Sequence, residues 1–148
     1  MLSIPTEESI TVEWFNACFA KAGLTGEVNG FDAARVGTGQ IGKCVRYTLR
    51  FKDQGELPKS VIGKFPSDDE NSRQTGVVLL NFLKEVKFYQ ELQQRVAIKT
   101  PRCYFSEITD QGPEFFLLLQ DLAPAQQGDQ LAGCSPQVAK AALAELVG

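Results

Sequence analysis

A strict alternation of side chains between residues 44 and 51 constrains the fold more than any other feature of the sequence. The apolar positions are Val45, Tyr47, Leu49 and Phe51, and polar residues or a cysteine stand between them. Successive side chains of a β-strand point to opposite faces, so this period of two predicts a strand with one buried face. A chain of 148 residues fits one domain, and such a strand must belong to a sheet within it.

The remaining segments separate into helical and extended patterns. We expect helices at residues 11–22, at 77–94 and from 135 to the end of the chain, a loop at 67–75, and further strands at 28–36, 60–65, 103–108 and 114–119. The order is therefore helix, three strands, helix, two strands, helix. Consecutive short strands joined by tight turns favour an antiparallel sheet with helices packed on it, which is an α+β fold.

Polar residues mark where the predicted helices begin. Thr6 and Thr11 are alternative starts for the first helix, and Gly23 ends it. Ser135 is expected to cap the last helix, with Pro136 at its first position. Much of the apolar side of the middle helix is expected to consist of Val78, Phe82, Val86, Tyr89 and Leu92.

Composition excludes several classes of site and of protein. Histidine is absent, which removes His-based catalytic triads and His metal sites. A formal net charge of −3 argues against general nucleic-acid or anionic-membrane binding. The four cysteines include no C-x-x-C pair, the chain has no signal-peptide pattern at its start, and its apolar runs are too short to span a bilayer. We therefore expect a cytoplasmic protein with reduced thiols, no bound metal cluster, no nucleic-acid partner and no membrane partner.

A glycine-rich turn at residues 37–42 is the first candidate site. Gly37, Gly39 and Gly42 match the pattern G-x-G-x-x-G. The dinucleotide-binding form of this pattern requires a helix directly after the glycines, whereas a strand follows here, so we reject it. A strand on each side indicates a hairpin whose backbone N–H groups can approach phosphate oxygens. The alternative is a hairpin turn that binds no ligand.

Lys64 and Glu85 form the second candidate site. Lys64 shares one face of a short strand with Ile62, and a lysine in a central strand is costly to bury unless it is paired. Glu85 lies on or beside the apolar stripe of the predicted middle helix. Each residue alone has a simpler explanation, since the ammonium can reach water and the carboxylate can sit on a solvated flank. Together they match the strand-lysine and helix-glutamate pair with which kinases aim a lysine at nucleotide phosphates.

The charge around these residues agrees with a phosphate site. Between residues 33 and 64 there are seven basic and two acidic side chains, within a chain that is acidic overall. A solvated strand face explains Arg46 and Arg50 better than ligand contact does.

The blocks of sequence after the glycine turn resemble a known family. They are V-I-G-K-F (61–65), K-E-V-K-F-Y (84–89), F-L-L-L-Q-D-L (116–122) and G-D-Q (128–130). Over residues 28–148 the chain resembles the N-terminal lobe of the aminoglycoside phosphotransferase family, which includes choline-kinase-like and ecdysteroid-kinase-like enzymes. The resemblance implies a protein-kinase-like N-lobe, with a five-stranded antiparallel sheet and a kinase-type helix, preceded here by an N-terminal helix.

The resemblance also implies roles for individual residues. Lys64, held by Glu85, would contact the α and β phosphates of ATP. Residues of the glycine turn would cover the phosphates: Gly37, Thr38, Gly39, Gln40, Ile41 and Gly42. The hinge between two lobes would be Gln120, Asp121 and Leu122, whose backbone would bind adenine in a pocket lined by Ile41 and Leu119. Many relatives carry Glu where this chain has Gln120, and a backbone contact tolerates that change.

The expected domain plan follows from the same resemblance. It gives an N-terminal helical extension (1–27), the kinase-like lobe (28–119), a hinge or linker (120–134) and the start of a C-lobe helix (135–148). In the family, the catalytic Asp and the metal-binding Asp lie in a C-terminal lobe, which we expect to lie outside these 148 residues. The expected ligands of Mg²⁺ are therefore outside this chain, and the 148-residue chain alone is predicted to be inactive.

The predicted function is that of the ATP-binding lobe of a small-molecule O-phosphotransferase, which transfers the γ-phosphate of ATP to a hydroxyl of a small acceptor. One alternative is a non-catalytic module that binds a nucleotide or a partner chain, and another is a purely structural α+β domain. Without a second lobe, the strand at 115–119 and the final helix are expected to be exposed and to promote self-association.

Overall fold

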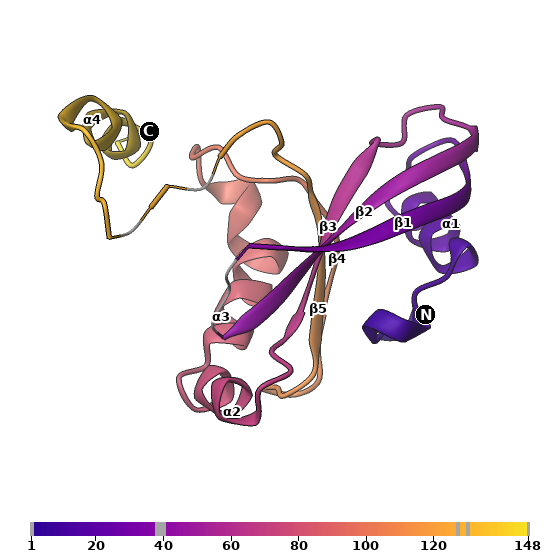
Figure 1. The fold of residues 1–148 in the computed structure, drawn as a ribbon, viewed down its shortest axis with the longest axis horizontal. Helices are drawn as coiled ribbons and strands as arrows, with labels where there is room; N and C mark the ends of the chain where they lie inside the picture. Colours follow the sequence, from indigo (N-terminus) through magenta and orange to yellow (C-terminus); the bar gives the residue numbers. More distant parts are fainter. Residues whose placement is uncertain (1, 38–40, 127, 130, 148) are drawn as a thin grey trace.

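The protein folds around one antiparallel sheet of five strands (Figure 1). The computed structural model describes residues 2–37, 41–126, 128–129 and 131–147. The strands are β1 (Glu27–Val36), β2 (Gly42–Asp53), β3 (Ser60–Pro66), β4 (Cys103–Ile108) and β5 (Phe115–Gln120), in the order β1-β2-β3-β5-β4. The α-helices are α1 (Val12–Lys21), α2 (Glu70–Val78), α3 (Asn81–Lys87) and α4 (Pro136–Ala144). The predicted α+β fold, with its five-stranded antiparallel sheet, is confirmed.

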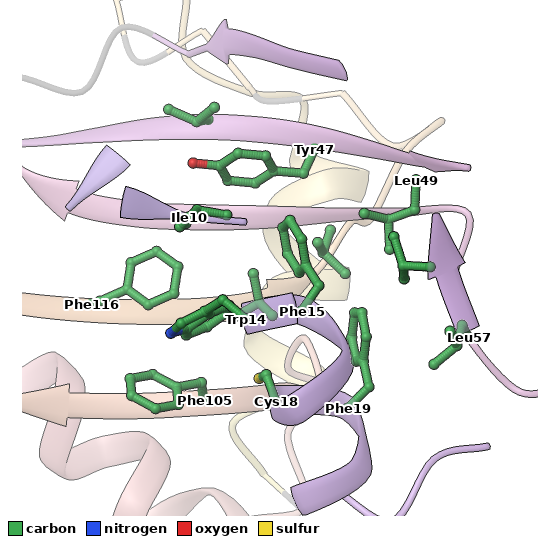
Figure 2. Close-up of a cluster of buried hydrophobic side chains, with 14 of the residues drawn as sticks. Ile10, Trp14, Phe15, Cys18, Phe19, Tyr47, Leu49, Leu57, Phe105 and Phe116 are labelled. Carbon is green, nitrogen blue, oxygen red and sulfur yellow. The ribbon is translucent and has the colours of Figure 1, made fainter. Parts of the chain in front are cut away.

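Helix α1 covers one face of the sheet. Thr11 caps the helix by accepting a hydrogen bond from the Trp14 N–H, and Gly23, at a φ of 75°, follows its end. The other candidate start, Thr6, precedes a separate 3₁₀ turn, Glu7–Ser9. The apolar side of α1 packs on the inward residues of β2, β3 and β5, and aromatic rings dominate this cluster (Figure 2). The alternation predicted for β2 is confirmed, since Val45, Tyr47 and Leu49 are buried on this face.

Helix α3 covers part of the opposite face. Its buried residues Phe82 and Val86 pack against Phe115, Leu117 and Leu119 of β5. Strand β5 is therefore buried on both faces, and its apolar residues are exposed by 8% or less. The expectation that residues 115–119 would be exposed is wrong, because α1 covers one side of the strand and α3 covers the other.

The helical region between β3 and β4 differs from the prediction of a loop at 67–75 and one helix at 77–94. Helix α2 already begins at Glu70, where the Asp69 carboxylate accepts a hydrogen bond from the Ser72 N–H. The chain then breaks at Leu80, which has a left-handed φ of 55°. Helix α3 is followed by a π-helical turn, Phe88–Leu92, and a 3₁₀ turn, Gln93–Arg95. The break changes the helical phase, so Val78 and Leu92 are 75% and 50% exposed instead of facing the core.

Helix α4 stands away from the sheet at the end of an irregular connection (Figure 1). Ser135 caps it and Pro136 occupies its first turn, as predicted, but it ends at Ala144 instead of continuing to the last residue. The expected exposure of this helix is confirmed, since Val138 and Leu143 are more than half exposed. No helix in the described part of the chain is both long enough and apolar enough to cross a membrane. The four cysteines, all within the described residues, are free.

Candidate functional site

A close ion pair joins the central strand to α3. Lys64 lies in β3 on the face that α3 covers, and the two Glu85 carboxylate oxygens lie 2.7 Å and 2.6 Å from its Nζ. Helix α3 fixes Glu85 beside the pair because the next residue, Val86, is fully buried against β5. The two side chains are 27% and 31% exposed, so the pair is accessible from solvent without being fully solvated. The contact predicted between Lys64 and Glu85 is confirmed, while their roles toward a phosphate remain predictions.

A cleft of about 460 Å³ opens on the same face of the sheet. Most of its lining is apolar, and it comes from β1, β2, β3, β5 and the segment after β5. The lining residues are Val36, Gly37, Cys44, Arg46, Ile62, Pro101, Leu119, Gln120, Asp121, Leu122, Ala123 and Ala125. Lys64 and Glu85 are not among the lining residues, but Cys44 is the cross-strand partner of Lys64, so the ion pair lies next to the cleft. Lys64 pairs with Leu117 of β5, three positions before Gln120, so Lys64 and the predicted hinge lie on neighbouring strands.

Among the lining residues, Arg46 of β2 binds the Asp121 carboxylate. Arg46 Nε lies 2.6 Å from Oδ2 and an Nη atom lies 3.2 Å from Oδ1, which is a bidentate contact. The carboxylate also accepts hydrogen bonds from the Ser60 hydroxyl and the Ala123 N–H. Burial acts to raise the pKa of Asp121, but these hydrogen bonds and the Arg46 charge outweigh it and lower the pKa. The prediction of a simply solvated face is wrong for Arg46, because the chain after β5 turns back toward β2.

The predicted hinge lies along the cleft, but its first residue is already hydrogen-bonded. The Gln120 N–H donates to the Arg102 carbonyl, and the Gln120 side-chain oxygen accepts from the Arg102 N–H. The Gln120 N–H is therefore not free to bind a base, while the predicted hinge role of residues 120–122 stays a prediction. The backbone groups of Asp121 and Leu122 remain candidates for that contact, and Leu122 is 52% exposed.

The structure describes Gly37, Ile41 and Gly42 of the glycine turn. Thr38, Gly39 and Gln40 lie outside the described residues. Gly37 lines the cleft with a φ of 74°, a conformation that favours glycine. A Cβ on Gly42 would lie 3.0 Å from the Phe65 carbonyl oxygen and 3.5 Å from Lys64 Cε, so a side chain there would crowd the strand that carries the lysine.

Leu119 and Ile41, which were both predicted to line the adenine pocket, differ in their positions. Leu119 lines the cleft, as expected for a pocket residue. Ile41 packs against the cluster around Phe82 and Phe115, which lies below α3. Ile41 is not among the residues that line this cleft, so its predicted place in the pocket has no support here, although Leu119 belongs to the same cluster and does line the cleft.

Sequence reasoning missed seven residues that line the cleft: Val36, Cys44, Arg46, Ile62, Pro101, Ala123 and Ala125. A signal for three of them was present. Ile62 has the same strand parity as Lys64, and Cys44 and Arg46 are the non-apolar positions of the alternating strand. Burial raises the pKa of the Cys44 thiol, with the Glu85 charge adding to this and Lys64 opposing it. Cys44 therefore contributes shape to the cleft and is a weak nucleophile.

The geometry supplies a partly exposed cation, a carboxylate that orients it and an adjacent apolar cleft. That combination suits a ligand with a flat apolar part and an anionic part. Among the described residues, no group of three or more Cys, Asp or Glu side chains is arranged to hold a metal ion. No protein-family model matches the chain, and no curated protein matches its sequence.

Proposed function

We propose that this chain is the ATP-binding lobe of a small-molecule O-phosphotransferase with a protein-kinase-like N-lobe. The observation that carries the proposal is the Lys64–Glu85 ion pair next to a cleft whose lining includes Asp121 and Leu122. A strand order of β1-β2-β3-β5-β4, with α3 between β3 and β5 in the sequence, is compatible with such a lobe.

Different parts of ATP would bind to different parts of the cleft. A purine ring is apolar on both sides, and one side would lie on the aliphatic groups of Ile62 and Leu119, which are cross-strand neighbours in the lining. A volume of about 460 Å³ lies within the range of small-molecule sites, which is roughly 300–1,000 Å³. The phosphates would extend toward Lys64, and Glu85 would hold its ammonium in place. ATP supplies the transferable γ-phosphoryl group, and its Mg²⁺ would take protein ligands from a second lobe.

Phosphoryl transfer depends mainly on positioning and on charge neutralisation. Lys64 would neutralise charge on the α and β phosphates. Among the described residues no group of three or more acidic or cysteine side chains is arranged to hold a metal ion, so the proposal places the metal ligands and the base for the acceptor hydroxyl in a second lobe. We therefore propose that the chain binds ATP and that transfer to a small hydroxylated acceptor requires the second lobe.

A partner-binding module is the second candidate, and α4 favours it. Leu122, Val138 and Leu143 are exposed by more than half, and among the described residues α4 makes no extensive contact with any strand of the sheet. Apolar exposure of this kind is typical of a surface that another lobe or chain covers. This candidate predicts self-association or capture of a partner without any effect of ATP.

Titration of the chain with Mg-ATP, followed by calorimetry, tests the proposal. Lys64→Ala should raise the Kd at least about tenfold, because a charge-assisted hydrogen bond to phosphate contributes roughly 1.5–3 kcal/mol. Lys52→Ala is the matched control, since Lys52 is a 69%-exposed strand lysine that pairs only with Glu27 among the described residues. Equal affinity in the wild type and Lys64→Ala, or no binding by the wild type up to millimolar ATP, would contradict the proposal.

A further inference from the structure

The Asp121 side chain ties the first residues after β5, the exit segment (121–125), to two other strands. Its Oδ2 accepts from Arg46 Nε of β2 at 2.6 Å and from the hydroxyl of Ser60, the first residue of β3, at 2.8 Å. Its Oδ1 accepts from an Arg46 Nη at 3.2 Å and from the Ala123 N–H at 3.0 Å. The side chain is only 5% exposed. These four hydrogen bonds occupy both carboxylate oxygens.

The Arg46–Asp121 pair crosses β3 on the face of the sheet that carries the cleft. Arg46 and Ile62 are cross-strand partners, and so are Ile62 and Leu119. All three of these side chains line the cleft, and so does Asp121. The ion pair is therefore part of the cleft wall, next to the apolar surface of Ile62 and Leu119.

The two ion pairs of this face lie on opposite sides of Ile62. Ser60, which holds Asp121, comes two positions before Ile62, and Lys64 comes two positions after it. At 3.3 Å per residue, Ser60 and Lys64 are roughly 13 Å apart along β3. A ligand whose phosphates reach Lys64 therefore extends its other end toward Asp121 and the exit segment.

Two backbone donors of the exit segment have no acceptor within the described part of the chain. They are the N–H groups of Asp121 and Leu122, and both residues line the cleft. The groups beside them are already paired, since the Leu122 carbonyl accepts from the Ala125 N–H at 2.9 Å. Backbone N–H groups are strong donors, and a ring nitrogen of a purine is a matching acceptor.

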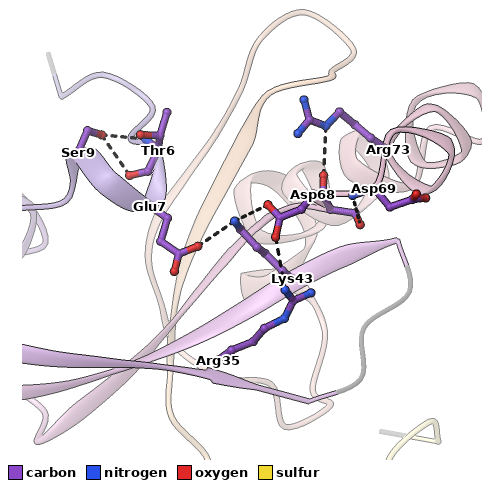
Figure 3. Close-up of polar contacts among 9 residues, drawn as sticks. Thr6, Glu7, Ser9, Arg35, Lys43, Asp68, Asp69 and Arg73 are labelled. Carbon is purple, nitrogen blue, oxygen red and sulfur yellow. Dashed lines mark hydrogen bonds and ion pairs between the residues drawn. The ribbon is translucent and has the colours of Figure 1, made fainter.

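A second carboxylate binds strand cations on the opposite face of the sheet (Figure 3). Asp68 lies 2.6 Å from Lys43 of β2 and 3.3 Å from Arg35 of β1. Lys43 lies 5.8 Å from the centroid of the Phe65 ring, which belongs to the core under α1. None of these residues lines the cleft. Asp68 is thus similar to Asp121 in its chemistry but not in its position, which makes it a matched comparison.

We infer that Asp121 is a positioning residue for the base of the bound nucleotide. Through Arg46 and Ser60 it fixes the exit segment so that the N–H groups of Asp121 and Leu122 can donate to the edge of the base. The carboxylate itself does not bind the base, because its oxygens are already occupied. The inference rests on the proposed function, since a base lies there only if ATP occupies the cleft.

Titration with Mg-ATP and with Mg-tripolyphosphate, which has the phosphates but no base, tests this role by calorimetry. In Asp121→Asn, the Kd for Mg-ATP should rise about three- to tenfold, since a neutral hydrogen bond contributes roughly this factor. The Kd for tripolyphosphate should stay within about twofold of the wild type. A direct charge effect has the opposite sign, because loss of a carboxylate favours an anion, and a general distortion of the cleft would weaken both ligands.

Asp68→Asn is the control and should change neither Kd. Ser60→Ala removes one of the four hydrogen bonds and serves as a second variant if Asp121→Asn folds poorly. It should raise the Kd for Mg-ATP by a smaller factor. An unchanged Kd for Mg-ATP in both Asp121→Asn and Ser60→Ala, or an equal increase for both ligands, would overturn the inference.

The wild type separates this inference from the proposed function. If it binds Mg-ATP no more tightly than tripolyphosphate, no base contact exists and the inference fails, while phosphate binding at Lys64 is retained. If it binds neither ligand, the proposed function fails, and amide exchange at Leu122 and Ala123 decides whether Asp121 fixes the exit segment. Faster exchange in Asp121→Asn than in the wild type supports that part, and equal exchange contradicts it.

Discussion

The two faces of the sheet differ in what their residues can do. The face under α1 is closed by aromatic side chains, and Phe15 contacts the rings of Phe19, Phe31 and Tyr47. The face under α3 is only partly closed, and it carries Lys64 and Arg46 with their acidic partners. One face therefore provides most of the buried apolar surface, and the other provides accessible charge next to a cleft.

Strand β3 contributes to both faces, since alternate residues lie in the aromatic core and on the side of the cleft. In β3, Val61, Gly63 and Phe65 point toward α1, while Ile62 and Lys64 point toward the cleft. Gly63 is needed on the closed face, since a Cβ there would lie 2.8 Å from the Tyr47 ring and 3.0 Å from the Phe116 ring. Alternate residues of β3 therefore have separate roles. Substitutions on the face under α1 should lower the free energy of unfolding, and substitutions on the face under α3 should weaken the binding of a ligand.

Phe15→Ala should have the largest effect on stability. The ring is fully buried, and truncation of a core Phe costs about 3–5 kcal/mol. Unfolding by urea measures this loss, and the Kd for Mg-ATP of the folded fraction should stay within about twofold of the wild type. Phe88→Ala is the control from the α3 side, where the ring is half-buried and the expected loss is smaller. An equal loss in both variants would contradict the comparison.

Much of the fold was predictable because its signals are local. The alternation through Val45 and Tyr47 determined the strand and its buried face, and the spacing of Trp14 and Phe19 determined the helix that covers it. The Lys64–Glu85 contact was also predictable, since an isolated charge on a buried element requires a partner.

Helix α2 and the Arg46–Asp121 pair were not predicted, because both depend on contacts between residues that are distant in the sequence. Helix α2 has a polar sequence with Gly76 in it, and this glycine is required because a side chain there would overlap the Phe82 ring. The Arg46–Asp121 pair spans 75 positions, and it forms only because the chain after β5 folds back toward β2. A local sequence pattern contains no information about either contact.

Asp121→Asn should lower the free energy of unfolding by an intermediate amount, and the size of this loss should depend on pH. The folded-state pKa of Asp121 is lowered, so its contribution is present above the unfolded pKa of about 3.9 and disappears as the pH falls through the folded value. At pH 7 we expect a loss of about 1–2 kcal/mol, because the carboxylate is 5% exposed and its hydrogen bonds are charge-assisted.

Urea unfolding of the wild type and Asp121→Asn between pH 3 and pH 7 measures this effect. The two stability curves should converge at the acid end, because a protonated Asp121 resembles the amide. Asp32→Asn is the control, since Asp32 pairs with Arg50 on the outside of the sheet and is 74% exposed. A difference between wild type and Asp121→Asn that stays constant down to pH 3 would show that the carboxylate charge is not the cause.

The Lys64–Glu85 pair should contribute least to stability, although it carries the proposed function. Both side chains are more than a quarter exposed, and pairs with solvent access typically contribute about 0–1 kcal/mol. A double-mutant cycle with Lys64→Met and Glu85→Gln isolates the coupling between them in urea unfolding. If the coupling exceeds about 2 kcal/mol, the pair behaves like a structural element and the contrast between the two faces fails. A small coupling, together with loss of Mg-ATP binding in each single variant, is the result expected if this face is organised for a ligand, since the ammonium is then held in place for an anion that the folded chain does not itself supply.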